Sequence, residues 1–279
     1  MNLAASDKRH LGFTLIELLV ALGIFLVITG AAFTLLSASQ HRYQTESLVL
    51  TSFQEARLGL DQMVRDINDA GFPPPAFAGT DLTKFAITPF GWSTGAGYSG
   101  TPCQIGMAGG GTCTTASPTN SPGDFDLIIE TNPNIQDPLS RVQWIRYQLV
   151  GTTLMRGVAD KGPGGSDPDA FTTAPGVLVP FVQNVVNNAC PPQIPNCQTA
   201  YPGIFPAGAP VPIFSYACDN SSPPPATIPC PGALADNSPT NIRDVMITLV
   251  VAAPLADATT GMPRLVQLNG RGRRINPNQ

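Results

Sequence analysis

The sequence has few of the residues on which most enzymes and metal sites depend. Its two histidines stand at His10 and His41, so the rest of the chain cannot form a Ser/His/Asp or Cys/His arrangement. No cysteines have Cys-x-x-Cys spacing, which argues against a zinc site. The glycine run at 109–111 is not followed by Lys-Ser or Lys-Thr, so no phosphate-binding loop is indicated. These absences predict a protein that is not an enzyme and holds no cofactor or metal.

Acidic residues provide two weaker candidates for chemistry. Asp124 and Asp126 flank the start of a strand-like segment, and we interpret them as a solvated edge rather than a glycosidase-type pair. Asp160, Asp167 and Asp169 lie in a Gly/Pro-rich loop and could offer oxygen atoms to Ca²⁺, but their spacing does not match an EF-hand loop. The sequence alone does not decide whether this loop binds Ca²⁺.

The amino-terminal region contains one long apolar run with a single acid in it. The run from Phe13 to Leu36 has about 24 residues, enough for a helix to span a bilayer. Lys8 and Arg9 precede it, so the positive-inside rule keeps the leader in the cytoplasm and places the later residues outside the inner membrane. Glu17 is unfavourable inside a membrane unless it is paired, which marks it as functional, with an amine as its natural partner.

Three other interpretations fit this region less well. A secretory signal peptide has an apolar stretch of only about 7 to 15 residues, although residues 37–39, Ser-Ala-Ser, look like a cleavage site. A plain membrane anchor explains the length of the run but not Glu17. A buried core helix explains neither the basic flank nor the length.

The helix is predicted to continue beyond the apolar run, from residue 37 to residue 70, in amphipathic form. Apolar residues recur at alternating spacings of four and three, with polar residues on the opposite face. Gly71 and the three prolines at 73–75 predict its end. A helix from Phe13 to Ala70 would be about 85 Å long. The apolar stripe is Val49, Phe53, Ala56, Leu60, Met63, Ile67 and Ala70, and the wet face is Glu55, Arg57, Asp61, Gln62, Arg65, Asp66 and Asp69.

Beyond the helix, short strand-like segments alternate with long loops. Proline and glycine make up about a fifth of the chain, above the usual level but short of a disordered composition. Residues 142–149, the turn residues 151–152 and residues 154–156 indicate a hairpin. An antiparallel sheet with one face on the helix stripe satisfies both patterns, which predicts an α+β fold. We expect strands at 125–130, 142–150, 153–156, 176–186, 211–217 and 243–252, and loops at 80–123, 160–175 and 190–212.

All six cysteines follow the apolar run, in a compartment where disulfides form and persist. Proximity favours three local pairs, each closing a Pro- or Gly-rich loop, although the sequence does not fix the connectivity. The favoured pairs are Cys103 with Cys113, Cys190 with Cys197, and Cys218 with Cys230.

Residues 12–17, Gly-Phe-Thr-Leu-Ile-Glu, together with the basic leader and the apolar run, resemble the class III signal of type IV prepilins. The resemblance implies that a prepilin peptidase cuts after Gly12, removes residues 1–12 and methylates the new amino terminus at Phe13. It also implies that Glu17 attracts the terminal amine of a neighbouring subunit as a filament grows. Many pilins have a proline about two-thirds along this helix, where this chain has Gly-Ala-Ala at 30–32.

Residues 54–72 and the hairpin and last-strand runs are similar to PilW-type minor pilins, and residues 54–72 also to the J-type minor pseudopilins of type II secretion. The resemblance implies a pilin-like fold with a long helix on an antiparallel sheet and disulfide-stapled loops. Residues 13–36 would span the membrane and later enter the filament core, and residues 37–70 would form the amphipathic half of the helix. Residues 71–279 would form a β-rich head in the periplasm or outside the cell.

The expected function is a minor type IV pilin that helps to initiate or cap pilus assembly. Its expected partners are prepilin peptidase, other major and minor pilins, the inner membrane before assembly and a possible tip adhesin. No nucleic acid is expected, because Arg271, Arg273 and Arg274 form only a small basic tail on a chain of net charge −4. The alternatives are a J-type minor pseudopilin and a pilus-displayed adhesin or DNA-capture subunit, which an exposed aromatic or basic patch including Trp92, Tyr98 or the arginine tail would favour.

Overall fold

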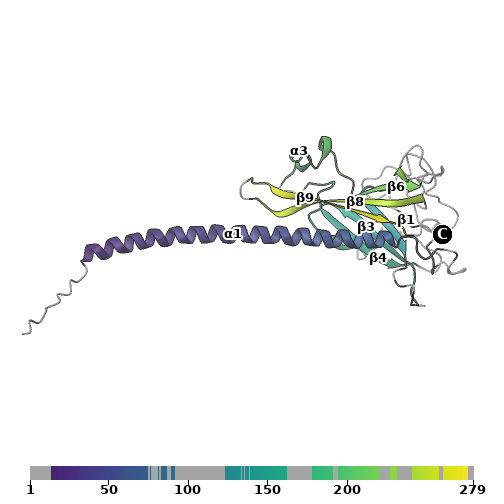
Figure 1. The fold of residues 1–279 in the computed structure, drawn as a ribbon, viewed down its shortest axis with the longest axis horizontal. Coiled ribbons are helices and arrows are strands. Elements are labelled where there is room, and N and C mark those ends of the chain that lie inside the picture. Colours follow the sequence, from purple (N-terminus) through teal and green to yellow (C-terminus); the bar gives the residue numbers. More distant parts are fainter. Residues whose placement is uncertain are drawn as a thin grey trace, which may run out of the picture. The chain divides into compact units, whose positions relative to one another are not determined.

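A computed structural model describes residues 14–74, 76, 81, 83–86, 89–91, 123–132, 134, 136–137, 139–161, 178–190, 194–219, 227–230, 241–257 and 260–275. The chain divides into two compact units, residues 1–48 and 49–279. Helix α1 (Leu15–Asn68) contributes residues to both units and is the only element described in the first (Figure 1).

The amino-terminal long helix and its end agree with the sequence patterns to within two residues. Thr14 precedes the first turn, and Gly71 adopts a positive φ of 81°, the left-handed conformation that glycine tolerates best. The carbonyl of Asn68 accepts a hydrogen bond from the Ile275 amide, and its side-chain oxygen accepts one from the Arg273 amide. The end of the helix is therefore tied to the last described strand.

The first sheet is antiparallel, with strands in the order β1-β2-β3-β4-β5. The predicted hairpin is confirmed: β3 and β4 pair along their whole length, and Gly151 provides the positive φ of the turn. The short strand β1 was not expected from the sequence. The bounds are β1 Phe90–Gly91, β2 Asp126–Thr131, β3 Gln143–Val150, β4 Thr153–Asp160 and β5 Leu178–Val182.

A second antiparallel sheet has the order β7-β6-β8-β9. The predicted α+β architecture of a long helix with antiparallel strands is confirmed, but the strands form two sheets where one was expected. After β5 the chain crosses to this sheet, where Val185 bridges Val251. The sequence did not predict β7 or β9, because β7 is short and contains Pro229, and β9 alternates only around Val266 and Leu268 before its two glycines. Residues 271–273, expected in a tail, belong to β9. The bounds are β6 Phe214–Asp219, β7 Thr227–Cys230, β8 Ile242–Ala256 and β9 Pro263–Arg273.

Within the second unit, the apolar stripe of α1 packs against strands from both sheets. Three glycines allow this close approach, because a Cβ at Gly59 would lie 2.5 Å from Val182 Cγ2, and one at Gly272 would lie 2.4 Å from Ile67 Cγ2. The third is Gly270, beside Leu60. The helix therefore contacts β5 of the first sheet and β9 of the second. The buried stripe is Ala56, Leu60, Met63, Ile67 and Ala70.

The expected loop at 190–212 contains a short helix α3 (Cys197–Ala200) and a 3-10 turn (Pro206–Gly208). It packs Ile194, Cys197 and Phe205 against Val250 and Ala252 of β8. The predicted Cys190–Cys197 disulfide is present. Asn187 fixes the same region, because its amide donates to the carbonyls of Val211 and Thr248 and its oxygen accepts from the Val250 amide.

Two other predicted cysteine pairs involve residues outside the described side chains. Cys218 is disulfide-bonded. The β6–β7 register places Cys230 opposite Tyr216, which is two residues before Cys218 on β6. Cys103 and Cys113 lie outside the described residues. The pairing of these four cysteines stays a prediction.

Candidate assembly site and polar clusters of the head

The start of α1 is closed by hydrogen bonds between Thr14 and Glu17. The Thr14 amide and hydroxyl donate to Glu17 Oε2 at 3.0 Å and 2.9 Å, and the Glu17 amide donates to Thr14 Oγ1 at 3.3 Å. This reciprocal capping box satisfies donors that a helix start otherwise leaves unpaired, and a carboxylate near the positive end of the helix dipole is favourable. Gly12 and Phe13 lie outside the described residues, so their roles stay predictions.

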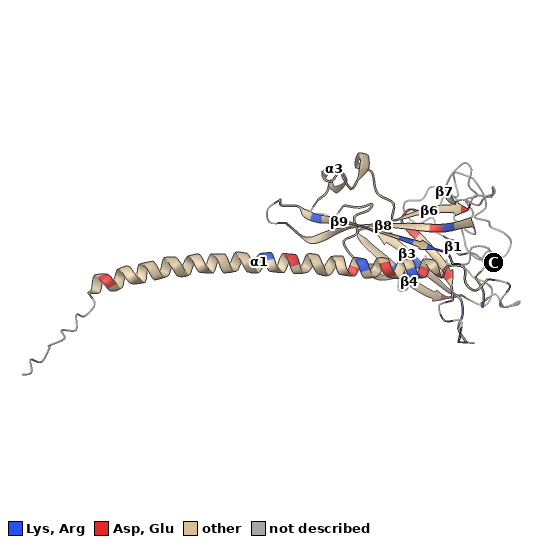
Figure 2. Cartoon of the chain, in the orientation of Figure 1, with Lys and Arg blue, Asp and Glu red and all other residues tan. Residues whose placement is uncertain are grey.

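The helix surface that follows Glu17 is apolar and uncovered. No Asp, Glu, Lys or Arg occurs between Glu17 and Arg42 (Figure 2), and every described residue from 14 to 36 is exposed. By length and composition, α1 is the one described helix that could cross a membrane. An exposed apolar surface of this size requires a lipid or protein environment, because its exposure to water is unfavourable.

Residues 7–33 match the family described as the prokaryotic N-terminal methylation motif. The chain carries a type IV prepilin-like signal. This match spans the predicted cleavage site, the predicted methylated residue and Glu17. The signal implies processing by a prepilin peptidase and pilin-like interactions, and with the apolar helix it indicates a membrane-anchored state before assembly. No curated protein and no solved structure matches the chain.

Beyond the signal, a buried polar cluster joins α1 to the first sheet. Asp66 Oδ2 accepts hydrogen bonds from the Tyr147 hydroxyl at 2.6 Å and from Arg156 Nη2 at 3.0 Å, and Gln62 donates to Oδ1 at 2.8 Å. Burial, followed by the negative charge of Asp66, raises the pKa of Tyr147. The placement of Asp66 on the wet face of the helix is therefore wrong: only 8% of this residue is exposed.

Two ion pairs are buried on the first sheet. Arg146 binds Asp126 through two hydrogen bonds of 3.0 Å and 2.6 Å, and Lys161 binds Glu130 while also donating to the Phe85 carbonyl. The interpretation of Asp126 as part of a solvated edge is wrong, because this residue is buried, and Arg146 compensates its charge. Asp124 is exposed, as expected. Sequence reasoning missed both pairs, since their members lie 20 and 31 residues apart and only the fold brings them together.

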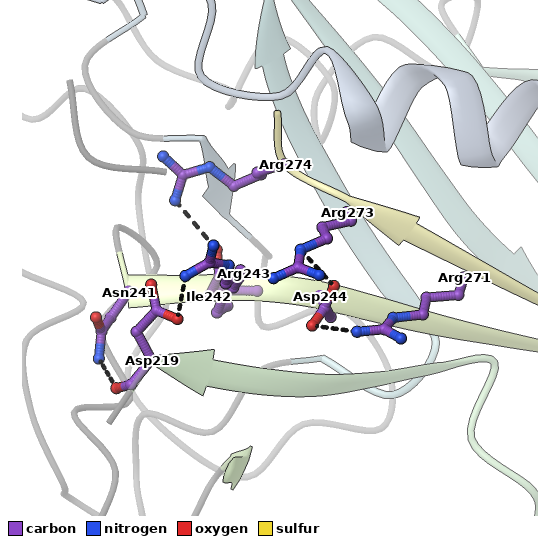
Figure 3. A network of polar contacts seen from close by, with 8 residues as sticks. All are labelled: Asp219, Asn241, Ile242, Arg243, Asp244, Arg271, Arg273 and Arg274. Atoms are coloured by element: carbon purple, nitrogen blue, oxygen red, sulfur yellow. Dashed lines mark hydrogen bonds and ion pairs between the residues drawn. The ribbon is translucent and has the colours of Figure 1, made fainter. Parts of the chain in front are cut away.

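Arginine and aspartate side chains gather where β6, β8 and β9 meet (Figure 3). Arg271 Nη2 and Arg273 Nε lie 2.7 Å and 3.7 Å from the two oxygens of Asp244. Arg274, expected in a solvated tail, is 6% exposed and donates to the Ile242 carbonyl at 3.1 Å. Burial lowers the pKa of Arg274 to about 10, although Asp219 opposes this shift. The three expected tail residues thus have different surroundings.

The candidate Ca²⁺ ligands receive no support from the described part of the chain. Asp160 accepts a hydrogen bond from Gln143 at 2.9 Å, while Asp167 and Asp169 lie outside the described residues. Among the described residues, no group of three His, Cys, Asp or Glu side chains could hold a metal ion.

Proposed function

We propose that this protein is a minor type IV pilin of the PilW type, a non-enzymatic subunit that helps to initiate or cap filament assembly. The observation that carries the proposal is an exposed helix surface with no charge between Glu17 and Arg42, directly after a prepilin-like signal. Such a helix resides in lipid as a precursor and in a bundle of similar helices after assembly. In this proposal the head has a structural role and catalyses no reaction.

The capping box suggests how Glu17 acts during assembly. Thr14 occupies one carboxylate oxygen, Oε2, through two hydrogen bonds. We expect the other oxygen, Oε1, to accept the terminal amine of a neighbouring subunit. In a low-dielectric helix bundle this attraction is only weakly screened, so it favours transfer of the helix from lipid to filament.

The alternative is a J-type minor pseudopilin, which would use the same helix chemistry in a periplasmic filament. The size of the head favours the pilin, since J-type heads are typically smaller. Genetic neighbours would separate the two, because a secretion system and a pilus have different companion proteins.

The decisive experiment compares Glu17→Ala with the wild type in cells. We expect intact processing and head structure but reduced incorporation, measured as the amount in sheared filaments relative to the membrane pool. Glu17→Asp should be intermediate, since its charge survives on a shorter side chain. Glu55→Ala, which removes an exposed acid from the same helix, is the matched control. Equal incorporation of Glu17→Ala and wild type would contradict the assembly role.

A second measurement tests processing separately. Mass spectrometry of the mature amino terminus should find N-methylated Phe13, and replacing Gly12 by a bulky residue should leave the precursor in the membrane. A mature protein that begins at Gln40 would indicate ordinary signal peptidase instead.

A further inference from the structure

The outward face of β9 carries a line of exposed polar side chains that the proposed filament role does not explain. Alternate residues of a strand point to the same face, and in β9 the intervening glycines pack on α1. The register places Arg273 opposite Asp244 and Arg271 opposite Met246. We call the line the polar row; it consists of Gln267, Asn269, Arg271 and Arg273.

The two guanidinium groups of the polar row are held in place by one carboxylate from below (Figure 3). Asp244 is fully buried, whereas the side chains of Arg271 and Arg273 are 57% and 54% exposed. One negative charge therefore supports two positive ones, and the pair keeps a net positive charge toward solvent. Each guanidinium has five N–H donors in a planar fork, which suits bidentate binding of a carboxylate.

The other half of the polar row is neutral and can bind hydroxyl groups. Asn269 Oδ1 accepts hydrogen bonds from Thr248 Oγ1 and Gln267 Nε2, both at 3.2 Å, which orients its amide N–H donors. Ser215, opposite Met246 in the register, adds an exposed hydroxyl to the same face. Same-face residues recur about every 7 Å along a strand, so the row extends about 20 Å, enough for a short oligosaccharide.

We propose that the polar row binds an acidic polysaccharide, with uronic-acid carboxylates at Arg271 and Arg273 and sugar hydroxyls at Asn269 and Gln267. A nucleic acid fits less well. Duplex DNA carries a charge about every 1.7 Å, whereas the row has two cations on a chain of net charge −4. The row also has no aromatic side chain on which a base could stack. This inference does not depend on the filament role.

The test measures binding of fluorescent oligogalacturonate to the full-length protein in detergent. Arg271→Gln/Arg273→Gln should bind about tenfold more weakly or worse, because two charge-assisted contacts are lost. Arg264→Gln is the matched control: this β9 arginine is 65% exposed and pairs with Asp257, and its loss should leave binding unchanged. Arg271→Lys/Arg273→Lys should be intermediate, since it keeps the charge but not the planar fork.

Three outcomes would overturn the proposal. They are an absence of oligogalacturonate binding by the wild type, equal binding of its neutral methyl ester, and tighter binding of a DNA duplex with the same dependence on Arg271 and Arg273. Because loss of both guanidiniums leaves Asp244 buried and less well paired, Asp244→Asn is added to the double variant. The resulting triple variant must be folded and show the same loss of binding.

Discussion

The contact between α1 and β9 allows a graded prediction from three glycine-to-alanine changes. At Gly272 the new Cβ would lie 2.4 Å and 2.6 Å from Cγ2 and Cβ of Ile67, atoms fixed close to the helix backbone. At Gly270 the nearest atom, at 2.7 Å, is Cδ1 of Leu60, the far end of a flexible side chain. Gly203 has nothing within 4 Å.

Overpacking of a core contact costs about 1–3 kcal/mol, while alanine in place of a strand glycine gains about 0.5–1 kcal/mol. We therefore expect Gly272→Ala to lower the free energy of unfolding by about 1–2 kcal/mol, Gly270→Ala by less, and Gly203→Ala hardly at all. Each kcal/mol lowers Tm by about 2–4 °C in a domain of this size.

Denaturant and thermal unfolding of the full-length protein in detergent measures these differences. Tryptophan fluorescence reports on the head, because both tryptophans follow residue 71 and one of them, Trp144, is 1% exposed. Equal unfolding midpoints for the Gly272 and Gly203 variants would refute the close packing of β9 on the helix. A Gly270 variant less stable than the Gly272 variant would refute the argument from side-chain flexibility.

Three further predictions concern the interior of the head. Burial and a neighbouring carboxylate raise the pKa of Tyr147 above its ordinary 10.0. The unfolded chain therefore loses this proton at lower pH than the folded protein, and the free energy of unfolding falls as pH rises above about 10. Urea unfolding midpoints should show a smaller fall for Tyr147→Phe, and an unchanged fall for Tyr43→Phe, which alters an exposed tyrosine. Lys161→Met should destabilise the head by about 3–5 kcal/mol, because its carboxylate partner stays buried, and a loss below about 1 kcal/mol in denaturant unfolding would contradict this. Replacing Cys190 and Cys197 by alanine should increase proteolysis of their loop while leaving the sheet signal in circular dichroism; unchanged protease resistance would argue against the staple.

Local patterns in the sequence predicted the parts of the fold that depend on near neighbours. The helix follows from its apolar periodicity, its end from Gly71 and the prolines, and the β3–β4 hairpin from alternation around a turn. The prepilin-like signal is also local, since Gly12, Phe13 and Glu17 lie within six positions of one another. The short Cys190–Cys197 loop made its disulfide predictable for the same reason.

Tertiary structure decided the features that depend on residues far apart in the chain. The second sheet depends on the pairing of β9 with β8. The two glycines of β9 face the helix, but they add no apolar residue to the strand pattern, so the sequence did not indicate this contact. Asp66 has the spacing of a wet-face residue, yet Tyr147 and Arg156 approach it from β3 and β4 and allow its burial. The arginines at 271 and 273 resembled a solvated tail until the register placed Asp244 beneath them. The sequence identifies the charged and polar residues, but the partner of each one depends on which strands lie side by side in the fold.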